Sequence, residues 1–201
     1  MRMNAVGRAV LNSPARAVAQ RRFVLPAMRR LGGGLEGCRV LEIGCGRGSG
    51  VALIIDLLGA RSVDAIDVDP AMVRRAARRV GPRSDVRIGD MVDTGAASAS
   101  YDAVVDMGAM HLEPRWREAL RETRRILKPG GHLYFEEIVR PARQSASALA
   151  TGRRLPRDFA RQALLEQLDA LQFVVTGLEH TRWAALTGMV GDLIGVAALP
   201  A

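Results

Sequence analysis

Four glycines stand at alternate positions, 44, 46, 48 and 50, in the segment VLEIGCGRGSG. They follow an apolar run that carries one carboxylate, Glu42. Because glycine has no Cβ, the chain can turn sharply there and a ligand can approach the main-chain N–H groups. The N-terminus of a following helix would add a positive dipole end. Such a loop can hold a dinucleotide, a mononucleotide or no ligand, and the glycines alone do not choose among these.

The dinucleotide fingerprint G-x-G-x-x-G tests the first alternative. A fingerprint that begins at Gly44 requires glycine at position 49, where the chain has Ser49. A frame that begins at Gly46 stays open on spacing alone. An NAD-dependent oxidoreductase is further disfavoured because the chain has no recognisable Tyr-x-x-x-Lys pair, Lys128 being its only lysine.

Carboxylates also end three later apolar segments, as Asp67 in SVDAIDVD, Asp90 in VRIGD and Asp106 in YDAVVDMG. Asp67 lies 21 residues after Gly46. A carboxylate at the end of a strand there can accept two hydrogen bonds from the hydroxyls of a ribose. These positions therefore extend the possible site beyond the glycine loop.

Each carboxylate also has a purely structural interpretation. Glu42 can serve as a partner for a backbone N–H at the end of a buried strand. Asp69 precedes Pro70 and is expected to cap a helix, a role that we do not expect for Asp67. Asp90 follows Gly89 and can be a turn residue.

Strand patterns alternate with helix patterns from residue 38 to residue 139. This alternation predicts an α/β, doubly wound, mostly parallel seven-stranded sheet whose ligands bind at the carboxyl ends of the strands. No βα unit separates the last two strands, so we expect antiparallel pairing there. The predicted strands cover residues 38–44, 62–69, 85–90, 101–108, 131–139, 173–186 and 188–199. The predicted helices cover 14–31, 49–59, 70–81, 114–128 and 155–172, and the fourth is closed by Pro129 and two glycines.

Ser13 and Pro14 are expected to start an N-terminal helical extension, which includes the apolar residues Val18, Phe23 and Leu25 with arginines in between. Residues 94–100 and 140–156 are expected to be loops. The second loop follows the fifth strand, on the ligand side of such a sheet.

The motifs LEIGCGRGSG, DAIDVDPAMV, VRIGDMVD, YDAVVDMGAMHLEP and RILKPGGHLYFEE occur in this order. Together they resemble class I S-adenosylmethionine-dependent methyltransferases of the small-molecule type. The resemblance covers residues 38–139, and the closing strands extend it toward residue 199. It implies a Rossmann-like fold with S-adenosyl-L-methionine as cofactor. It also implies one domain, 1–201, with a helical cap (1–36), a donor-binding core (37–139) and a closing part (140–201).

The resemblance assigns roles to the carboxylates. The donor carries a sulfonium and an ammonium, whose positive charges favour a carboxylate such as Glu42 at the methionine end. Asp67 would accept from the ribose hydroxyls and Asp90 from the adenine amino group. The implied donor-binding residues are Glu42, Gly44, Cys45, Gly46, Asp67, Val68, Asp90, Met91, Asp106 and Met107.

Methyl transfer needs proximity, alignment and exclusion of water, plus a base when the acceptor must lose a proton. His111 follows the fourth strand, where many small-molecule members of the family carry a histidine; packing or hydrogen bonding at a helix entry is the alternative. Glu136 and Glu137 end the fifth strand and point to opposite faces. We name His111 and Glu137 as catalytic candidates, expect His132 to be structural, and keep His180 as a further candidate.

The chain lacks the N/D-P-P-Y/F tetrad of amino-methyltransferases that act on adenine, glutamine or cytosine. The fourth-strand segment is similar instead to the branch that methylates quinones, lipids and natural products. The N-terminal helix and the loop at 140–156 would then cover the acceptor pocket. A non-catalytic S-adenosylmethionine-binding protein and a nucleic-acid methyltransferase remain as alternatives.

The net charge of +8 is compatible with a nucleic-acid partner. The arginines are spread along the chain rather than gathered in one tail, so we expect none. Neither a membrane-spanning stretch nor a secretory signal is evident, and a cytoplasmic protein is expected. Cys38 and Cys45 fit no metal-ligand spacing, so no metal is expected. The oligomeric state stays open.

Overall fold

The computed structural model describes residues 13–139, 156, 158–181 and 193–201. Most of the predicted loop at 140–156 therefore lies outside the described residues. The same holds for the end of the predicted strand at 173–186 and the beginning of the one at 188–199.

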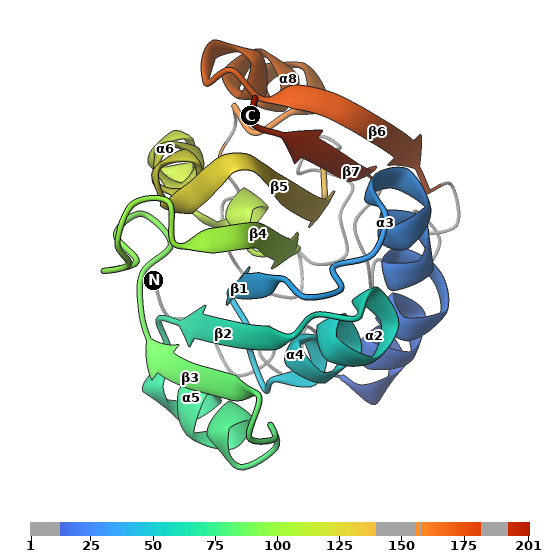
Figure 1. Cartoon of the computed structure of the whole chain (residues 1–201), viewed down its shortest axis with the longest axis vertical. Helices are drawn as coiled ribbons and strands as arrows, with labels where there is room; N and C mark the ends of the chain where they lie inside the picture. The colour runs from blue at the N-terminus through green and yellow to red at the C-terminus, as the bar shows by residue number, and fades with distance from the viewer. Residues whose placement is uncertain (1–12, 140–155, 157, 182–192) are drawn as a thin grey trace.

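A seven-stranded sheet runs through the molecule in the order β3-β2-β1-β4-β5-β7-β6 (Figure 1). The first five strands pair in parallel, and β7 is antiparallel to both of its neighbours. This confirms the predicted mostly parallel, doubly wound sheet. The chain reverses its direction of travel across the sheet between β1 and β4, where open sheets of this kind bind ligands. The strands are β1 (Arg39–Ile43), β2 (Ser62–Asp67), β3 (Ser84–Ile88), β4 (Tyr101–Met107), β5 (Leu127–Glu137), β6 (Val174–His180) and β7 (Leu193–Ala198).

Helices cover both faces of the sheet and bury two apolar clusters. One cluster joins the N-terminal helix to the helix after β1, through residues such as Met28 and Leu58. The other cluster includes Trp116 and Leu168 on the opposite face. None of the helices in the described part of the chain is long and apolar enough to cross a bilayer. The helices that follow the strands are α4 (Ser49–Leu53), η2 (Ile54–Leu58), α5 (Pro70–Ala77), η3 (Met110–Leu112), α6 (Trp116–Ile126) and α8 (Arg161–Ala170).

The N-terminal helix is continuous but contains one wide turn. It runs through α2 (Pro14–Ala19), the π-helical η1 (Gln20–Val24) and α3 (Leu25–Gly32). Ser13 Oγ accepts a hydrogen bond from the Arg16 N–H at 3.2 Å, which confirms the predicted cap. Pro26 lacks an N–H and would crowd the preceding turn of a regular α-helix, and the π turn just before it accommodates the ring.

The fourth predicted helix ends earlier than the sequence suggested. We predicted a helix that is closed by Pro129, but α6 ends at Ile126 and β5 begins at Leu127. Lys128 precedes Pro129, and proline disfavours a helical backbone in the residue before it. Leu127 is already extended and pairs with Tyr101 of β4. The LKPGG segment is therefore the first part of the strand.

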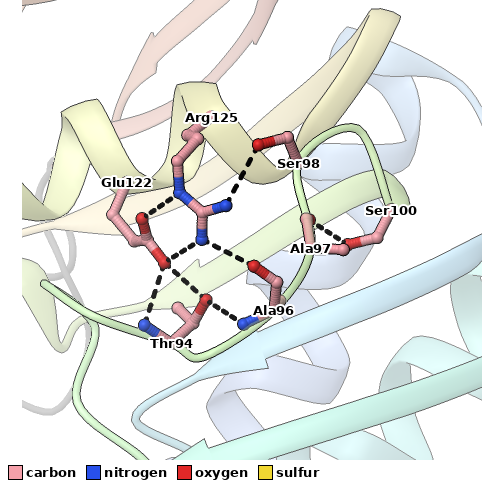
Figure 2. A network of polar contacts seen from close by, with 7 residues as sticks. All are labelled: Thr94, Ala96, Ala97, Ser98, Ser100, Glu122 and Arg125. Carbon is pink, nitrogen blue, oxygen red and sulfur yellow. Dashed lines mark hydrogen bonds and ion pairs between the residues drawn. The ribbon is translucent and has the colours of Figure 1, made fainter.

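The predicted loop at 94–100 has no regular secondary structure and is hydrogen-bonded to side chains of α6 (Figure 2). Glu122 Oε1 accepts hydrogen bonds from the N–H and the hydroxyl of Thr94, at 2.9 and 2.6 Å. Arg125 donates to the Ala96 carbonyl at 2.7 Å and to the Ser98 hydroxyl at 3.1 Å. Burial raises the pKa of Glu122, but the hydrogen bonds from Arg125 and Thr94 outweigh it and leave this pKa at about 2.

Candidate active site

A cavity lies at the carboxyl ends of β1, β2 and β4, where the sheet topology predicts a ligand site. One side of it is formed by Ser13, Arg16, Ala17 and Gln20 of the N-terminal helix, which we call the roof. The remaining lining residues come from the strand ends and the segments after them: Glu42, Gly44, Cys45, Gly46, Ser49, Gly50, Ile66, Asp67, Val68, Asp69, Gly89, Asp90, Met91, Met107, Gly108, Ala109, Leu112 and Glu113.

Nine of the ten predicted donor-binding residues line this cavity. The tenth, Asp106, is completely buried and does not reach it. The catalytic candidates His111 and Glu137 are also buried, and neither is among the residues that line the cavity. The structure thus separates the predicted residues into a group at the cavity and a group behind its wall.

The glycine loop follows β1 and has a left-handed backbone at several positions. Gly44 and Gly46 have φ values of 69° and 54°, which other residues rarely adopt. A Cβ on Gly44 would overlap the Cβ of Ala109 in the segment after β4. A Cβ on Gly50 would overlap Oε1 of Glu42. The glycines therefore let two strand ends approach each other and leave room for a carboxylate.

Glu42 places a carboxylate in the cavity wall that a hydrogen bond from the Val51 N–H compensates only in part. It is 3% exposed, and its Oε2 has no hydrogen-bond partner within the described part of the chain. Burial raises the pKa of Glu42 well above its ordinary value, and the charges of Asp67 and Asp106 raise it further. A cationic ligand would favour the ionised carboxylate, because opposite charges attract strongly where water is excluded. The sulfonium and ammonium of S-adenosylmethionine meet this requirement, whereas a pyrophosphate does not.

Asp67 lies at the end of β2 and lines the same cavity. Its Oδ2 accepts the Gly46 N–H at 2.9 Å, and its Oδ1 accepts the Asp69 N–H at 2.8 Å. Burial raises the pKa of Asp67, and these two N–H groups lower it. Each oxygen keeps a second acceptor position, so the carboxylate can still accept from a diol. The cap of α5 is Asp69, as predicted, because its Oδ1 accepts the Ala71 N–H at 2.9 Å.

Asp90 lies at the edge of the cavity, after β3. Its Oδ1 accepts the Val92 N–H at 3.1 Å, which is the turn arrangement that the sequence left open. Its Oδ2 accepts from Arg115 at 3.0 Å, a contact that the sequence did not predict. Asp90 is thus held in place by its neighbours, and its contact with an adenine ring stays a prediction.

Three buried side chains from β4, η3 and β5 meet behind the cavity wall, and we call Asp106, His111 and Glu137 the buried acid cluster. Asp106 accepts the N–H groups of Ala109 at 2.8 Å and Met110 at 3.1 Å. Glu137 Oε2 accepts the His111 N–H at 3.1 Å and lies 2.6 Å from His111 Nδ1. The carboxyl groups of Asp106 and Glu137 also lie close enough for each to change the pKa of the other.

Burial raises the pKa of both carboxyl groups. Burial raises the pKa of Asp106 well above its ordinary range, and the charge of Glu137 raises it further. Burial also raises the pKa of Glu137, but its interactions with Asp106 and the His111 N–H oppose this and leave it at about 7.

Glu136 points to the opposite face from Glu137, as predicted. There it lies 3.6 Å from the guanidinium of Arg16, and both side chains are nearly inaccessible. Arg16 also donates to the main-chain carbonyl of Met107 at 2.7 Å. The roof is thereby connected to the ends of β4 and β5.

Sequence reasoning missed the roof residues. Of the apolar residues noted in the N-terminal helix, Leu25 is buried, but Val18 and Phe23 are 64% and 47% exposed. Arg16 and Gln20 are buried instead, at 5% and 6%. These two polar residues are four positions apart, so they share one helical face, and that spacing was the available signal.

Two other histidines lie elsewhere. His132 pairs with Ala103 of β4, and its ring lies 6.2 Å from that of Tyr134. His180 is exposed at the end of β6. Neither is among the residues that line the cavity.

Comparison with known families identifies the central part of the chain. Residues 40–131 match the family model described as "Methyltransferase domain". This segment is similar to a methyltransferase domain. The matched segment reaches from β1 into the beginning of β5 and contains the cavity-lining residues other than those of the roof. Glu137 also lies outside it.

Curated proteins that are similar to this part of the chain include methyltransferases by name. One from Mycobacterium ulcerans is named "Probable phthiotriol/phenolphthiotriol dimycocerosates methyltransferase 2"; it is 36% identical over 113 residues, 56% of this chain and 43% of that protein. A fatty-acid O-methyltransferase of Mycolicibacterium smegmatis is 30% identical over 105 residues, 51% of this chain and 38% of that protein. The chain thus spans about two fifths of the length of these relatives.

Solved structures share the fold of the matched segment and of its flanking elements. A chain from the complex between the Haloferax volcanii Trm112 methyltransferase activator and a methyltransferase has a TM-score of 0.79 at 20% identity, with all of both chains covered. A geranyl diphosphate methyltransferase in complex with S-adenosylmethionine has a TM-score of 0.72 at 16% identity, with 98% of this chain and 96% of that chain covered. At such identities the similarity establishes the Rossmann-like fold alone.

Proposed function

We propose that the chain is a class I S-adenosylmethionine-dependent methyltransferase whose acceptor is a small molecule of the lipid kind rather than a nucleic acid. The observation that carries the proposal is the buried Glu42 carboxylate at the cavity, which a cationic donor would compensate. The names of the relatives support a lipid acceptor, since they act on phthiotriol-type lipids and fatty acids.

In this proposal, S-adenosylmethionine supplies the activated methyl group. Glu42 would face its positive end, Asp67 would accept from the ribose hydroxyls, and Asp90 with Met91 would border the adenine. The glycine loop would allow close approach through Gly44, Cys45 and Gly46. Val68, Asp106 and Met107 complete the proposed donor-binding set, with Asp106 acting through the main chain that it holds.

We also propose that His111 and Glu137 contribute to turnover. Both are buried behind the cavity wall, so any proton that His111 accepts from an acceptor must reach it past Leu112 and the neighbouring main chain. Glu137 would orient His111 and stabilise its protonated form, because its carboxylate lies 2.6 Å from Nδ1.

Donor binding can be measured by isothermal titration calorimetry and thermal shift with S-adenosylmethionine, its demethylated product and NADH. We expect the first two to stabilise the protein and NADH to have no effect, because a specific ligand raises the melting temperature of the state it binds. Stabilisation by NADH alone would contradict the proposal.

Asp67→Ala tests the ribose assignment. The loss of two hydrogen bonds to a charged acceptor should weaken donor binding about 100-fold or more. Asp56→Ala removes an exposed carboxylate from η2 and serves as the matched control, for which we expect unchanged binding. Equal effects in the two variants would remove Asp67 from the proposed site.

Transfer itself is tested by incubating the protein with methyl-labelled donor and fractionated lipid extract. We expect label in an organic-soluble product. Label in a nucleic-acid fraction would favour a nucleic-acid methyltransferase, and donor binding without transfer to any fraction would favour a non-catalytic binding protein.

A further inference from the structure

We propose that the outer face of the N-terminal helix binds the surface of an anionic lipid bilayer, next to the cavity that its inner face covers. We define this outer face by Val18, Arg21, Arg22, Phe23 and Pro26, all of which are exposed. The inference rests on the proposed function, because such a contact would bring a lipid acceptor to the cavity.

The charge of the helix is entirely positive. Residues 13–35 contain five arginines and neither aspartate nor glutamate. Arg29 and Arg30 form ion pairs with Glu36 and Glu179. No ion pair within the described part of the chain involves Arg21 or Arg22. These two guanidinium groups are therefore available to phosphate groups outside the molecule.

Apolar side chains stand beside these arginines. Val18 and Phe23 are two of the five large apolar residues that are exposed in the described part of the chain. Helices that lie in a membrane interface combine exposed apolar residues with arginine and lysine in this way. A nucleic-acid backbone would attract the arginines but would gain nothing from burying Val18. The combination therefore favours a bilayer.

The position of the outer face connects it to the cavity. Arg16, Ala17 and Gln20 on the inner face line the cavity, and Arg16 fixes the helix to the ends of β4 and β5. The two faces are separated by the thickness of one helix, about 10 Å. A bilayer on the outer face would thus bring lipid close to the cavity while the roof stays in place.

Co-sedimentation of the full chain with vesicles tests the contact without requiring activity. We expect binding to vesicles of equal parts phosphatidylcholine and phosphatidylglycerol, weak binding to phosphatidylcholine alone, and a decrease with salt. Arg21→Gln combined with Arg22→Gln should lower partitioning about 25-fold, because each basic residue near an anionic surface contributes roughly fivefold. Val18→Ser should lower it about threefold.

Arg74→Gln combined with Arg75→Gln is the matched control. It removes an adjacent, exposed pair of arginines from α5, which lies beside β3 at the far edge of the sheet (Figure 1). We expect less than a twofold change in partitioning. A thermal melt of each variant verifies folding, and Arg21→Glu provides a second substitution at the same surface.

Three outcomes would overturn the proposal: equal losses in the test and control pairs, equal binding to neutral and anionic vesicles, or tighter binding to a DNA duplex than to anionic vesicles with the same dependence on Arg21 and Arg22. Donor titration of the same samples keeps the two proposals apart. Failure to bind donor with intact vesicle binding would contradict the proposed function, whereas the reverse result would contradict only the membrane contact.

Discussion

Glu42 is a carboxylate whose position at the cavity is unfavourable without a ligand. Its pKa is raised by burial and by two neighbouring carboxylates, so its charge destabilises the ligand-free protein. We expect Glu42→Gln to raise the melting temperature without donor and to weaken S-adenosylmethionine binding about 10- to 100-fold, as the loss of a charged interaction does. Calorimetry and thermal melts measure both effects.

Glu118→Gln, at an exposed position of α6, is the control for Glu42→Gln and should change neither quantity. Unchanged donor affinity in Glu42→Gln would show that this carboxylate serves the fold and not the donor.

A substitution at Gly50 tests how tightly the Glu42 carboxylate is packed. Alanine normally stabilises a helix by about 1 kcal/mol relative to glycine. At Gly50, however, the new methyl group would overlap Oε1 of Glu42 and the end of Met107. We expect Gly50→Ala to lower the free energy of unfolding by about 1–3 kcal/mol, measured by urea denaturation. Gly81→Ala, where the methyl group meets no atom within 4 Å, should lower it far less.

Among the elements, the ends of β4 and β5 meet through η3, and this junction carries the buried acid cluster. His111→Ala should leave donor affinity within about twofold, because the histidine does not line the cavity. We expect turnover to fall about 100-fold or more if His111 accepts a proton, in line with typical contributions of general bases. Single-turnover transfer from labelled donor measures this.

His111→Gln keeps a polar group and serves as the comparison for His111→Ala. Recovery of full activity in His111→Gln would indicate that the histidine only packs and hydrogen-bonds, the alternative that the sequence left open.

The sequence predicted most elements because each strand and helix has its own periodicity and its own start or stop residues. Asp69 before Pro70 and the glycine loop are signals of this local kind, and nine of the predicted donor residues therefore come together. The orientation of α2 was not predictable in this way, since the burial of Arg16 depends on a carbonyl 91 residues away. The pairing of Asp106 with Glu137 depends likewise on two strands becoming neighbours.

At the scale of the whole molecule, the shifted pKa values of the buried carboxyl groups together predict how the free energy of unfolding depends on pH. Glu42, Asp67, Asp106 and Glu137 have raised pKa values, and that of Glu137 is about 7. Between an ordinary carboxyl pKa of about 4 and pH 7, the folded state therefore binds more protons than the unfolded state. The free energy of unfolding of the ligand-free protein should consequently fall as the pH rises through this window.

At lower pH, the ionisation of Glu122 makes the free energy of unfolding rise as the pH rises. Its pKa is about 2 when folded and 4.5 ordinarily, so its contribution is present above pH 4.5 and is lost as the pH falls toward 2. We thus expect maximal stability between about pH 4 and pH 5, measured by urea unfolding at a series of pH values. Glu137→Gln should reduce the decline toward pH 7, and an increase in stability from pH 5 to pH 7 would contradict this assignment.

The place of β7 in the sheet has a consequence for synthesis on the ribosome. Residues 193–198 insert between β5 and β6, so a strand from late in the chain occupies an interior position. Until these residues emerge, the nascent chain presents β5 as an open edge with unpaired main-chain groups, and β6 has no partner to join. The part that surrounds the cavity is translated well before that edge is closed. Because β7 is translated last, the β5 edge has to be protected from pairing with other chains until residues 193–198 emerge.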